Sequence, residues 1–284
     1  MKTENVNFSK PLQNDNVLIH SEVKNLYQVT GLNCRRGLEK IIVSEGQIVN
    51  VVSDSYGHLP NELFFAKVEE ALNKADIHYI TRSINRDNRS FAVDYILSDE
   101  RFIVKVKNGL DKIRPMLRFV NSYDGSCKTS GSFGYFREVC TNGLHVSESN
   151  IGFSVKHRGE ICEFVMPEIR LLAQKFIDNE FYTLSRKFEV LAEQAVRDLQ
   201  GFVKLAVDKT KMFKFEASDK NLAPSLNANL IIEGVQREAR LLGEQPNKWL
   251  VYNAMNELLH TKLKKTFEQQ KNQDVNIFET ILAL

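Results

Sequence analysis

The stretch FVNSYDGSCKTSGSFGYFREVCTNGL, from Phe119 to Leu144, constrains the fold and the function of this chain more than any other. Small, polar and potentially reactive side chains fill two short runs on either side of a strand-like region rich in Gly and Ser. In a purely structural hairpin, apolar and polar residues would alternate along the strands. The composition therefore predicts a functional site carried by a sheet.

The overall charge excludes a strong general attraction to polyanions. The 284 residues carry 38 Lys and Arg against 36 Asp and Glu, a net charge of +2, and the 43% hydrophobic content is enough for a substantial core. Residues 101–160 differ, because they hold ten basic and five acidic side chains. This local excess of basic side chains predicts a basic region within the β-rich part of the chain.

Cysteine spacing and the absence of long apolar runs indicate a cytoplasmic protein. Cys34, Cys127, Cys140 and Cys162 form no C-x-x-C pair, so neither a zinc knuckle nor a disulfide scaffold is expected. The N-terminus lacks a secretory signal, and no run approaches the roughly 20 apolar residues of a membrane span. We expect reduced thiols and no membrane partner.

The first 160 residues show the pattern of an antiparallel sheet with at least one helix. Residues 1–36 are expected to form an N-terminal arm, and residues 37–160 a β-rich region. Glu45-Gly46 separates two β-branched runs and predicts a hairpin, and Pro60 precedes a helical apolar stripe. A strand meander and further strands are predicted at residues 77–84, 90–97, 102–106, 115–120 and 151–155.

Residues 161–284 are predicted to be α-helical and packed on the sheet in one compact unit. Apolar residues recur at helical spacing from Pro167 to Gly201, which predicts one helix about 50 Å long. Its stripe requires a cover, either the sheet or another subunit in a homo-oligomer. Further helices are expected at residues 225–242, 247–270 and 275–284. The fold class is therefore α+β, an antiparallel β-sheet N-terminal half packed with a long-helix, α-rich C-terminal half.

The first polar run, Asn121 to Ser126, has two interpretations. Asn, Asp and Gly form tight turns for backbone reasons, which favours a simple connection between strands. Alternatively, Asp124 beside Asn121 and Ser126 could act as a general base or hold a cation.

The second polar run contains Arg137, Cys140 and Asn142, and His157 follows it. Arg137 could grip a phosphate or carboxylate, and Cys140 could be a nucleophile if a neighbouring cation stabilised its thiolate. A lone Cys between Val and Thr is more commonly a small buried residue. The two runs and His157 would form an active site only if strand pairing brings them together.

The helix that starts near Trp249 has an unusual polar face. Trp249, Asn253 and His260 lie opposite its apolar side, so this face is expected to meet the sheet, a ligand or a partner. Glu257 and His260 have the spacing of a metal pair, but two ligands are too few for a site. No phosphate-binding glycine motif and no common hydrolase motif occurs, so no cofactor and no metal is predicted.

These groups resemble a known family. Asn121-Ser122-x-Asp124-Gly125-Ser126, Arg137-x-Val139-Cys140-x-Asn142-x-Leu144, the element around His157, and Trp249-x-x-x-Asn253-Ala254 ahead of His260 occur in the order seen in the phage/plasmid-like proteins of domain-of-unknown-function family 932. Tyr56-x-x-x-Pro60-Asn61 resembles a further motif, while the Trp-His-Gly start of the family is missing. The resemblance covers residues 50–265 and implies a mobile-element setting without a known activity.

Three functions remain open. The basic region, with Arg114 and Arg118 and interleaved aromatic residues, favours binding of single-stranded nucleic acid. The alternative is an enzyme that acts on a nucleotide or another phosphorylated small molecule through Asn121, Asp124, Arg137, Cys140, Asn142 and His157. A third possibility is a phage structural or interaction protein whose long helix mediates oligomerisation.

Overall fold

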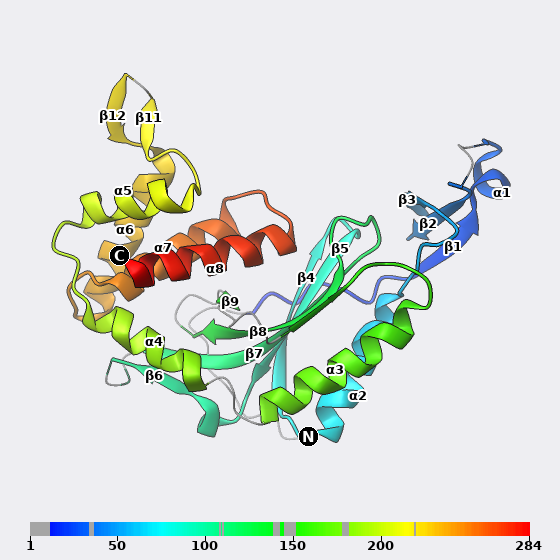
Figure 1. Cartoon of the computed structure of the whole chain (residues 1–284), viewed down its shortest axis with the longest axis horizontal. Coiled ribbons are helices and arrows are strands. Elements are labelled where there is room, and N and C mark those ends of the chain that lie inside the picture. The colour runs from blue at the N-terminus through cyan, green and yellow to red at the C-terminus, as the bar shows by residue number, and fades with distance from the viewer. Residues whose placement is uncertain are drawn as a thin grey trace.

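The computed structural model describes residues 12–33, 37–107, 109, 111–138, 143–144, 152–177, 182–218 and 220–284. Antiparallel sheets occupy the N-terminal half of the described chain, and most of the helices follow in the C-terminal half (Figure 1). The α+β fold class predicted from the sequence is therefore confirmed.

A seven-stranded antiparallel sheet forms the centre of the molecule. Its main path has the order β10-β8-β7-β5-β4, with β6 beside β7 and β9 beside β8. The third strand of the predicted meander, β6, thus pairs with β7 instead of with β5. The strands are β4 (Tyr79–Arg86), β5 (Ser90–Leu97), β6 (Val104–Val106), β7 (Asp111–Ser122), β8 (Thr129–Arg137), β9 (Gly143–Leu144) and β10 (Gly152–Val155).

The two faces of this sheet differ in chemistry. One face is aromatic and packs on α2 (Asn61–Lys74) and α3 (Ile161–Ile177), which lie on the same side in Figure 1. Gly131 belongs to this face, and a Cβ there would lie 2.8 Å from the Phe119 ring. The opposite face carries the polar residues Arg82, Asp94, Arg118 and Ser132. It lies beneath α7 (Lys248–Thr261) and α8 (Phe267–Ala283). The fully buried or nearly buried aromatic rings are Phe91, Tyr95, Phe119, Phe133 and Tyr135.

A three-stranded sheet projects from one end of the molecule (Figure 1). Its strands are β1 (Ser21–Asn25), β2 (Lys40–Ser44) and β3 (Gln47–Val52), and α1 (Leu26–Thr30) follows β1. Glu45 and Gly46 have φ values of +48° and +77°, the positive values that a tight hairpin turn requires. The predicted hairpin is therefore confirmed, and β1, from the predicted arm, extends it.

The single helix predicted from Pro167 to Gly201 is wrong. The chain forms separate helices there, because residues 194–198 leave the helical path. Val196 N donates to Pro246 O at 2.8 Å, and Lys248 N donates to Gln194 O at 3.0 Å, so these backbone groups bond across the molecule. The helices are α3, α4 (Tyr182–Glu193) and α5 (Leu199–Thr210).

The remaining C-terminal elements are a hairpin and three helices. The helix predicted at residues 247–270 is too long, because α7 ends at Thr261 and α8 starts after Thr266. Thr266 and Gln269 form a capping box that starts α8, a signal present in the sequence. The other elements are a short 3₁₀ helix (Glu100–Phe102), β11 (Glu216–Ser218), β12 (Asn221–Pro224) and α6 (Leu226–Leu242).

One large core joins the sheet to the helices. It extends from Val17 to Ile281, and the apolar side chains of α3 and α4 enter it. Ile169, Leu172, Phe188 and Leu191 are at most 2% exposed. These four residues of the apolar stripe are thus covered by the protein itself.

Candidate functional site

The polar face of the central sheet carries a row of charged residues on neighbouring strands. In the strand register, Arg82 of β4 pairs with Asp94 of β5, Asp94 with Arg118 of β7, and Arg118 with Ser132 of β8. Side chains alternate along a strand, so these four residues share the face opposite the aromatic core. The row crosses the sheet beneath α7 and α8.

Asp94 is fully buried between two arginines. Its Oδ2 accepts hydrogen bonds from Arg82 Nε at 2.8 Å, from Arg82 Nη2 at 2.5 Å and from Arg118 Nη2 at 2.7 Å, while Oδ1 accepts from Arg118 Nε. Burial alone would raise the pKa of Asp94, but the charges of Arg118 and Arg82 outweigh it and lower this pKa to about 2. Two guanidinium groups and one carboxylate leave the row with a charge of +1.

A first cavity of ≈ 200 Å³ opens beside Arg118. Ser130 and Ser132 of β8 and Ser154 of β10 line it, so small hydroxyl side chains stand where larger ones would fill the space. The half-buried Lys271 of α8 lies across from them, and burial lowers the pKa of its amine although Glu268 opposes this effect. The other lining residues are Val120, Cys127, Lys128, Phe267, Glu268 and Asn272.

A second cavity of ≈ 670 Å³ lies between the β4–β5 turn, the β7–β8 turn and the α7–α8 connection. Arg86 forms its wall, with its guanidinium carbon 3.7 Å from the centre of the Phe267 ring. Its Nη1 donates to Lys265 O at 2.7 Å and its Nη2 donates to Gln270 Oε1 at 2.8 Å. Arg89, Lys264 and Lys265 add three further cations to the lining.

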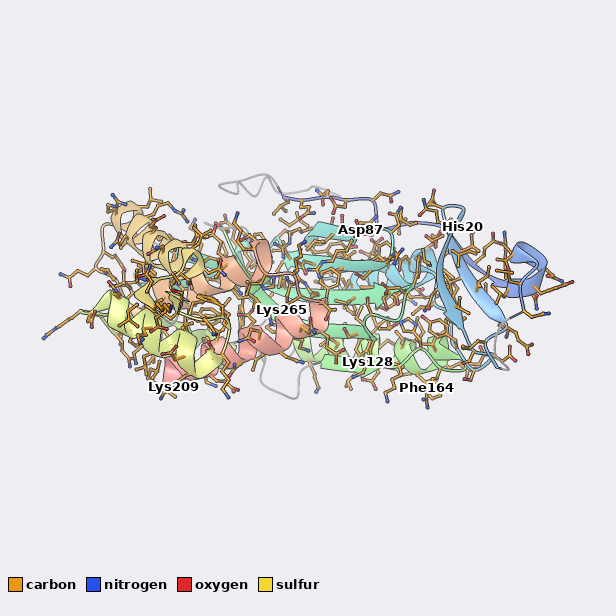
Figure 2. The ribbon with its side chains drawn as sticks, turned by 90° about the horizontal axis from the view of Figure 1, so that it is seen from above. His20, Asp87, Lys128, Phe164, Lys209 and Lys265 are labelled. Carbon is orange, nitrogen blue, oxygen red and sulfur yellow. The ribbon has the colours of Figure 1, made fainter. Side chains whose placement is uncertain are left out.

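The two cavities adjoin each other, because residues next to each other in the chain line both. Ser126 and Thr266 line the second cavity, and Cys127 and Phe267 line the first. Figure 2 shows Lys128 and Lys265 on the face seen from above, with Asp87 nearby. Seven cations and three carboxylates line the pair, which gives a net charge of +4. We call this surface the basic face; its cations are Arg86, Arg89, Arg118, Lys128, Lys264, Lys265 and Lys271.

The structure places Asn121 and His157 in a hydrogen-bonded network on the aromatic side of the sheet. Asn121 Nδ2 donates to Leu59 O and to Asn61 Oδ1, both at 2.8 Å, and Thr129 Oγ1 donates to Asn121 Oδ1 at 2.9 Å. His157 stacks on Tyr56, with ring centres 5.2 Å apart, and burial lowers its pKa although a hydrogen bond with Gly57 opposes this effect. These contacts hold the start of α2 against the sheet.

Asp124 and Ser126 occupy the β7–β8 turn. Asp124 Oδ1 accepts a hydrogen bond from Ser126 N at 2.9 Å, the contact expected of an Asp that stabilises its own turn. Both residues also line the second cavity of the basic face. The turn interpretation of this run is therefore confirmed, and the role of Asp124 as a general base or cation ligand stays a prediction.

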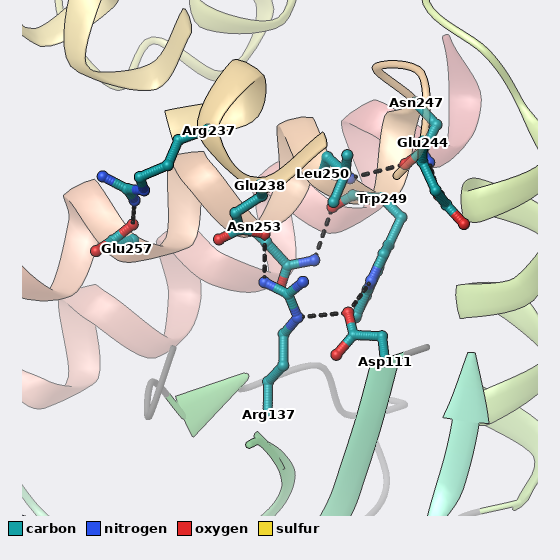
Figure 3. Close-up of polar contacts among 10 residues, drawn as sticks. All are labelled: Asp111, Arg137, Arg237, Glu238, Glu244, Asn247, Trp249, Leu250, Asn253 and Glu257. Carbon is teal, nitrogen blue, oxygen red and sulfur yellow. Dashed lines mark hydrogen bonds and ion pairs between the residues drawn. The ribbon is translucent and has the colours of Figure 1, made fainter. Parts of the chain in front are cut away.

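Arg137 and Trp249 meet at the other end of the sheet (Figure 3). Arg137 Nε and Trp249 Nε1 donate to the same carboxylate oxygen of Asp111, at 2.6 and 2.9 Å, and Arg137 Nη1 donates to Glu238 of α6 at 2.7 Å. Asn253 Nδ2 donates to Trp249 O at 2.7 Å, one helical turn away. The unusual tryptophan of α7 thus faces the sheet.

The residues of the proposed enzyme site are not brought together. Asp124 precedes β8 and Arg137 ends it, so the strand holds them about 25 Å apart. Cys140 and Asn142 lie outside the described residues. Arg114 lines neither cavity of the basic face. Its Nε donates to Glu138 at 2.7 Å, and its Nη1 donates to Leu97 O and Ser98 O.

His260 of α7 lies close to Arg118 and Arg82 of the charged row. Its Nε2 is 4.0 Å from Asp274 Oδ2, and Tyr252 donates to the other oxygen of Asp274 at 2.9 Å. Burial lowers the pKa of His260, while Asp274 opposes this effect. His260 also lines the second cavity. Among the sequence candidates, Arg118, Asp124, Ser126 and His260 therefore contribute to the basic face.

Nowhere in the described ranges do three His, Cys, Asp or Glu side chains gather in a way that could hold a metal ion. No helix in that part of the chain is both long and apolar enough to cross a membrane.

A protein-family model matches residues 48–282 of the chain. The chain belongs to the DUF932 family. The family is described as a domain of unknown function, and the resemblance inferred from the sequence motifs is confirmed. No curated protein and no solved structure shows significant similarity to the chain.

The DUF932 match contains the whole central sheet and both cavities of the basic face. Several residues of that face were not found from the sequence, among them Arg86 and Lys271, and neither was Asp94 of the charged row behind it. One signal in the sequence that could have revealed the basic face is the basic run from Lys262 to Lys265, directly before the α8 cap. The alternation of Ser130 and Ser132 along β8 was another, since it leaves one face of the strand without bulk.

Proposed function

We propose that this protein binds single-stranded nucleic acid through phosphate groups held on the basic face. The observation that carries the proposal is the concentration of seven cations in two adjoining cavities with a net charge of +4. The whole chain has a net charge of only +2, so the rest of the molecule supplies no general attraction. A local positive surface of this kind is the electrostatic footprint of a nucleic-acid site.

The recessed position of two of the cations favours a flexible strand over a duplex. Arg118 is 4% exposed and lines the first cavity, and Lys271 is half-buried there. A single strand can turn individual phosphates inward, whereas the phosphates of a duplex lie on a stiff cylinder. Single-strand selectivity therefore follows from the depth of these side chains.

Base stacking contributes less than the sequence suggested. Phe119, Tyr123, Phe133, Tyr135 and Phe136 are between 0% and 2% exposed, so none of these rings is accessible to a base. The proposed binding depends on phosphate contacts, which position a strand without reading its sequence. Weak sequence preference and strong salt dependence follow. The resemblance to phage and plasmid proteins motivates placing this activity in mobile-element nucleic-acid metabolism.

Fluorescence anisotropy with a labelled single-stranded oligonucleotide, as DNA and as RNA, tests the proposal. The triple variant Arg89→Gln, Lys264→Gln, Lys265→Gln removes three cations of the second cavity without touching the buried charged row. Loss of three phosphate contacts at low salt is expected to weaken binding about 100-fold. A duplex of the same length is expected to bind more weakly than the single strand.

The matched control removes the same charge elsewhere. Lys209, Lys211 and Lys220 are exposed and lie outside both cavities, and Figure 2 shows Lys209 near one end of the molecule. The variant with all three changed to Gln should bind within about threefold of the wild type, because only distant charges change. Equal weakening by both triple variants, or no binding by the wild type, would refute the proposal.

A further inference from the structure

The first cavity has hydrogen-bond donors that the protein itself leaves unused. Arg118 is 4% exposed and uses Nε and Nη2 for Asp94, while its Nη1 donates to no residue that the structure describes. The hydroxyls of Ser130, Ser132 and Ser154 also form no hydrogen bond within the described residues. Arg118 and Ser132 are each 4% exposed, and buried polar groups are normally paired, so a cavity lined by these two groups is suited to a polar occupant.

Lys271 adds a cation that lacks a counter-ion. Lys271 is half-buried and lines the same cavity. It makes no ion pair with any residue in the described part of the chain. Burial lowers the pKa of its amine, and a bound anion would oppose that shift. Lys128 differs, because its Nζ pairs with Glu268 at 3.2 Å on the rim.

The charge of the cavity matches a dianion. Arg118, Lys128 and Lys271 carry three positive charges, and Glu268 carries one negative charge, which leaves +2. Behind them, the charges of Arg82 and Asp94 cancel. A phosphomonoester has a charge between about −1.5 and −2 near neutral pH, whereas a phosphodiester within a strand has −1. The cavity is therefore better neutralised by a terminal phosphate than by an internal one.

The size of the cavity points to the same group. A volume of ≈ 200 Å³ is smaller than the roughly 300 Å³ at which pockets for whole small molecules begin. A phosphate and part of the attached sugar would fit a cavity of this size, and the base would remain outside. The second cavity adjoins it, so a strand whose end occupies the first cavity can continue across the basic face.

We propose that the first cavity is a phosphomonoester site, in which the guanidinium of Arg118, the amine of Lys271 and the three serine hydroxyls hold a terminal phosphate. The phosphate belongs either to the end of a nucleic-acid strand or to a free mononucleotide. The strand-end source rests on the proposed function; the mononucleotide source does not.

The test compares oligonucleotides that differ only in a terminal phosphate. A short labelled single strand with a 5′ or a 3′ phosphate is expected to bind about tenfold more tightly than the same strand with hydroxyl ends. Adenosine monophosphate should compete with the phosphorylated strand and remove this tenfold difference, whereas adenosine should not. If only adenosine monophosphate binds and no strand does, the proposed function fails and the site is assigned to a free nucleotide. If strands bind equally with and without the phosphate, the proposed function survives and this site is refuted.

Variants locate the effect without disturbing the buried row. Arg118→Gln would also unpair Asp94 and could unfold the protein, so Ser154→Asp and Lys271→Gln are the informative changes. Ser154 lies exposed on the edge strand β10, and an added carboxylate there would repel the phosphate. Both variants should abolish the tenfold preference. Lys264→Gln, in the second cavity, should weaken both oligonucleotides equally, and loss of the preference in that variant would contradict the assignment.

Discussion

At the scale of single residues, the buried row of Arg82, Asp94 and Arg118 determines the character of the polar face. A carboxylate held by two arginines in a buried position is favourable only while all three partners are present, because the removal of one leaves an unpaired buried charge. The row also holds Arg118 at the lining of the first cavity, and its Nη1 makes no hydrogen bond with a described residue. Stability and the proposed binding therefore depend on the same three side chains.

Asp94 predicts a specific dependence of stability on pH. The folded protein lowers the pKa of this carboxyl from 3.8 to about 2, so its contribution to stability is complete above pH 4 to 5 and is lost as the pH falls toward 2. The loss amounts to roughly 2 kcal/mol in the free energy of unfolding. Urea unfolding at several pH values should show this slope in the wild type and not in Asp94→Asn.

The control for this prediction is Asp87→Asn. Asp87 is exposed in the β4–β5 turn and makes no ion pair with any described residue. This variant should keep the wild-type slope and stability. An Asp94→Asn protein with an unchanged acid slope would show that the buried row does not behave as described.

Some roles of single residues could be predicted from the sequence, and others could not. The small and polar composition of residues 121–126 correctly indicated a turn, because Asp124 and Gly125 have backbone preferences that act locally. The pairing of Asp94 with two arginines could not be found in this way, since it depends on the register of three strands. The position of Ser130 and Ser132 in the first cavity could not be predicted either, because it depends on which face of β8 meets α8.

At the scale of elements, helix ends were the least predictable feature of the chain. The apolar spacing from Pro167 onward continues across the break between α4 and α5, because both helices bury their apolar sides in one core. The break occurs where backbone groups of Gln194 and Val196 form hydrogen bonds with Lys248 and Pro246. No local sequence pattern predicts these bonds, because they join segments far apart in the chain. The hairpin at Glu45-Gly46 and helix α2 were predictable because their signals are local.

The start of α5 predicts a measurable capping effect. Asp198 Oδ1 accepts a hydrogen bond from Gly201 N at 3.0 Å and satisfies one free amide of the first turn. Asp198→Ala is expected to lower the free energy of unfolding by about 1 kcal/mol. Asp208→Ala, at an exposed position near the other end of α5, should be neutral or slightly stabilising, because a carboxylate is unfavourable at a helix C-terminus. Equal losses in both variants, measured by urea unfolding, would exclude the cap.

At the scale of the whole molecule, the sheet and the helices share one core. The contact of Trp249 with Asp111, together with the ion pairs of Arg137, fixes α6 and α7 to the end of the sheet (Figure 3). Sequence periodicity predicted the two halves, since strand and helix periods differ. It could not predict that the basic face would form where the β4–β5 and β7–β8 turns meet the α7–α8 connection.

The shared core predicts that the described parts unfold together. Trp249 is the only tryptophan and lies 2% exposed at the junction of sheet and helices, so its fluorescence reports on that junction. Far-ultraviolet circular dichroism reports on the helices and strands as a whole. The two signals should give the same urea midpoint, as expected for one cooperative unit. Separate midpoints would show two independently folding parts.

The most direct test of the central claim is the salt dependence of single-strand binding by the wild type and the Arg89→Gln, Lys264→Gln, Lys265→Gln variant. Arg118 is buried, and the guanidinium of Arg86 already donates to Lys265 O and Gln270 Oε1. Five partly accessible cations of the basic face remain for phosphates: Arg89, Lys128, Lys264, Lys265 and Lys271. Each phosphate contact contributes about −0.7 to the slope of log K against log salt, so we predict a slope of roughly −3 for the wild type. In the variant, which lacks three of these contacts, the slope should be shallower by about 2. A slope near zero, or the same slope in both proteins, would contradict binding of phosphates on this face.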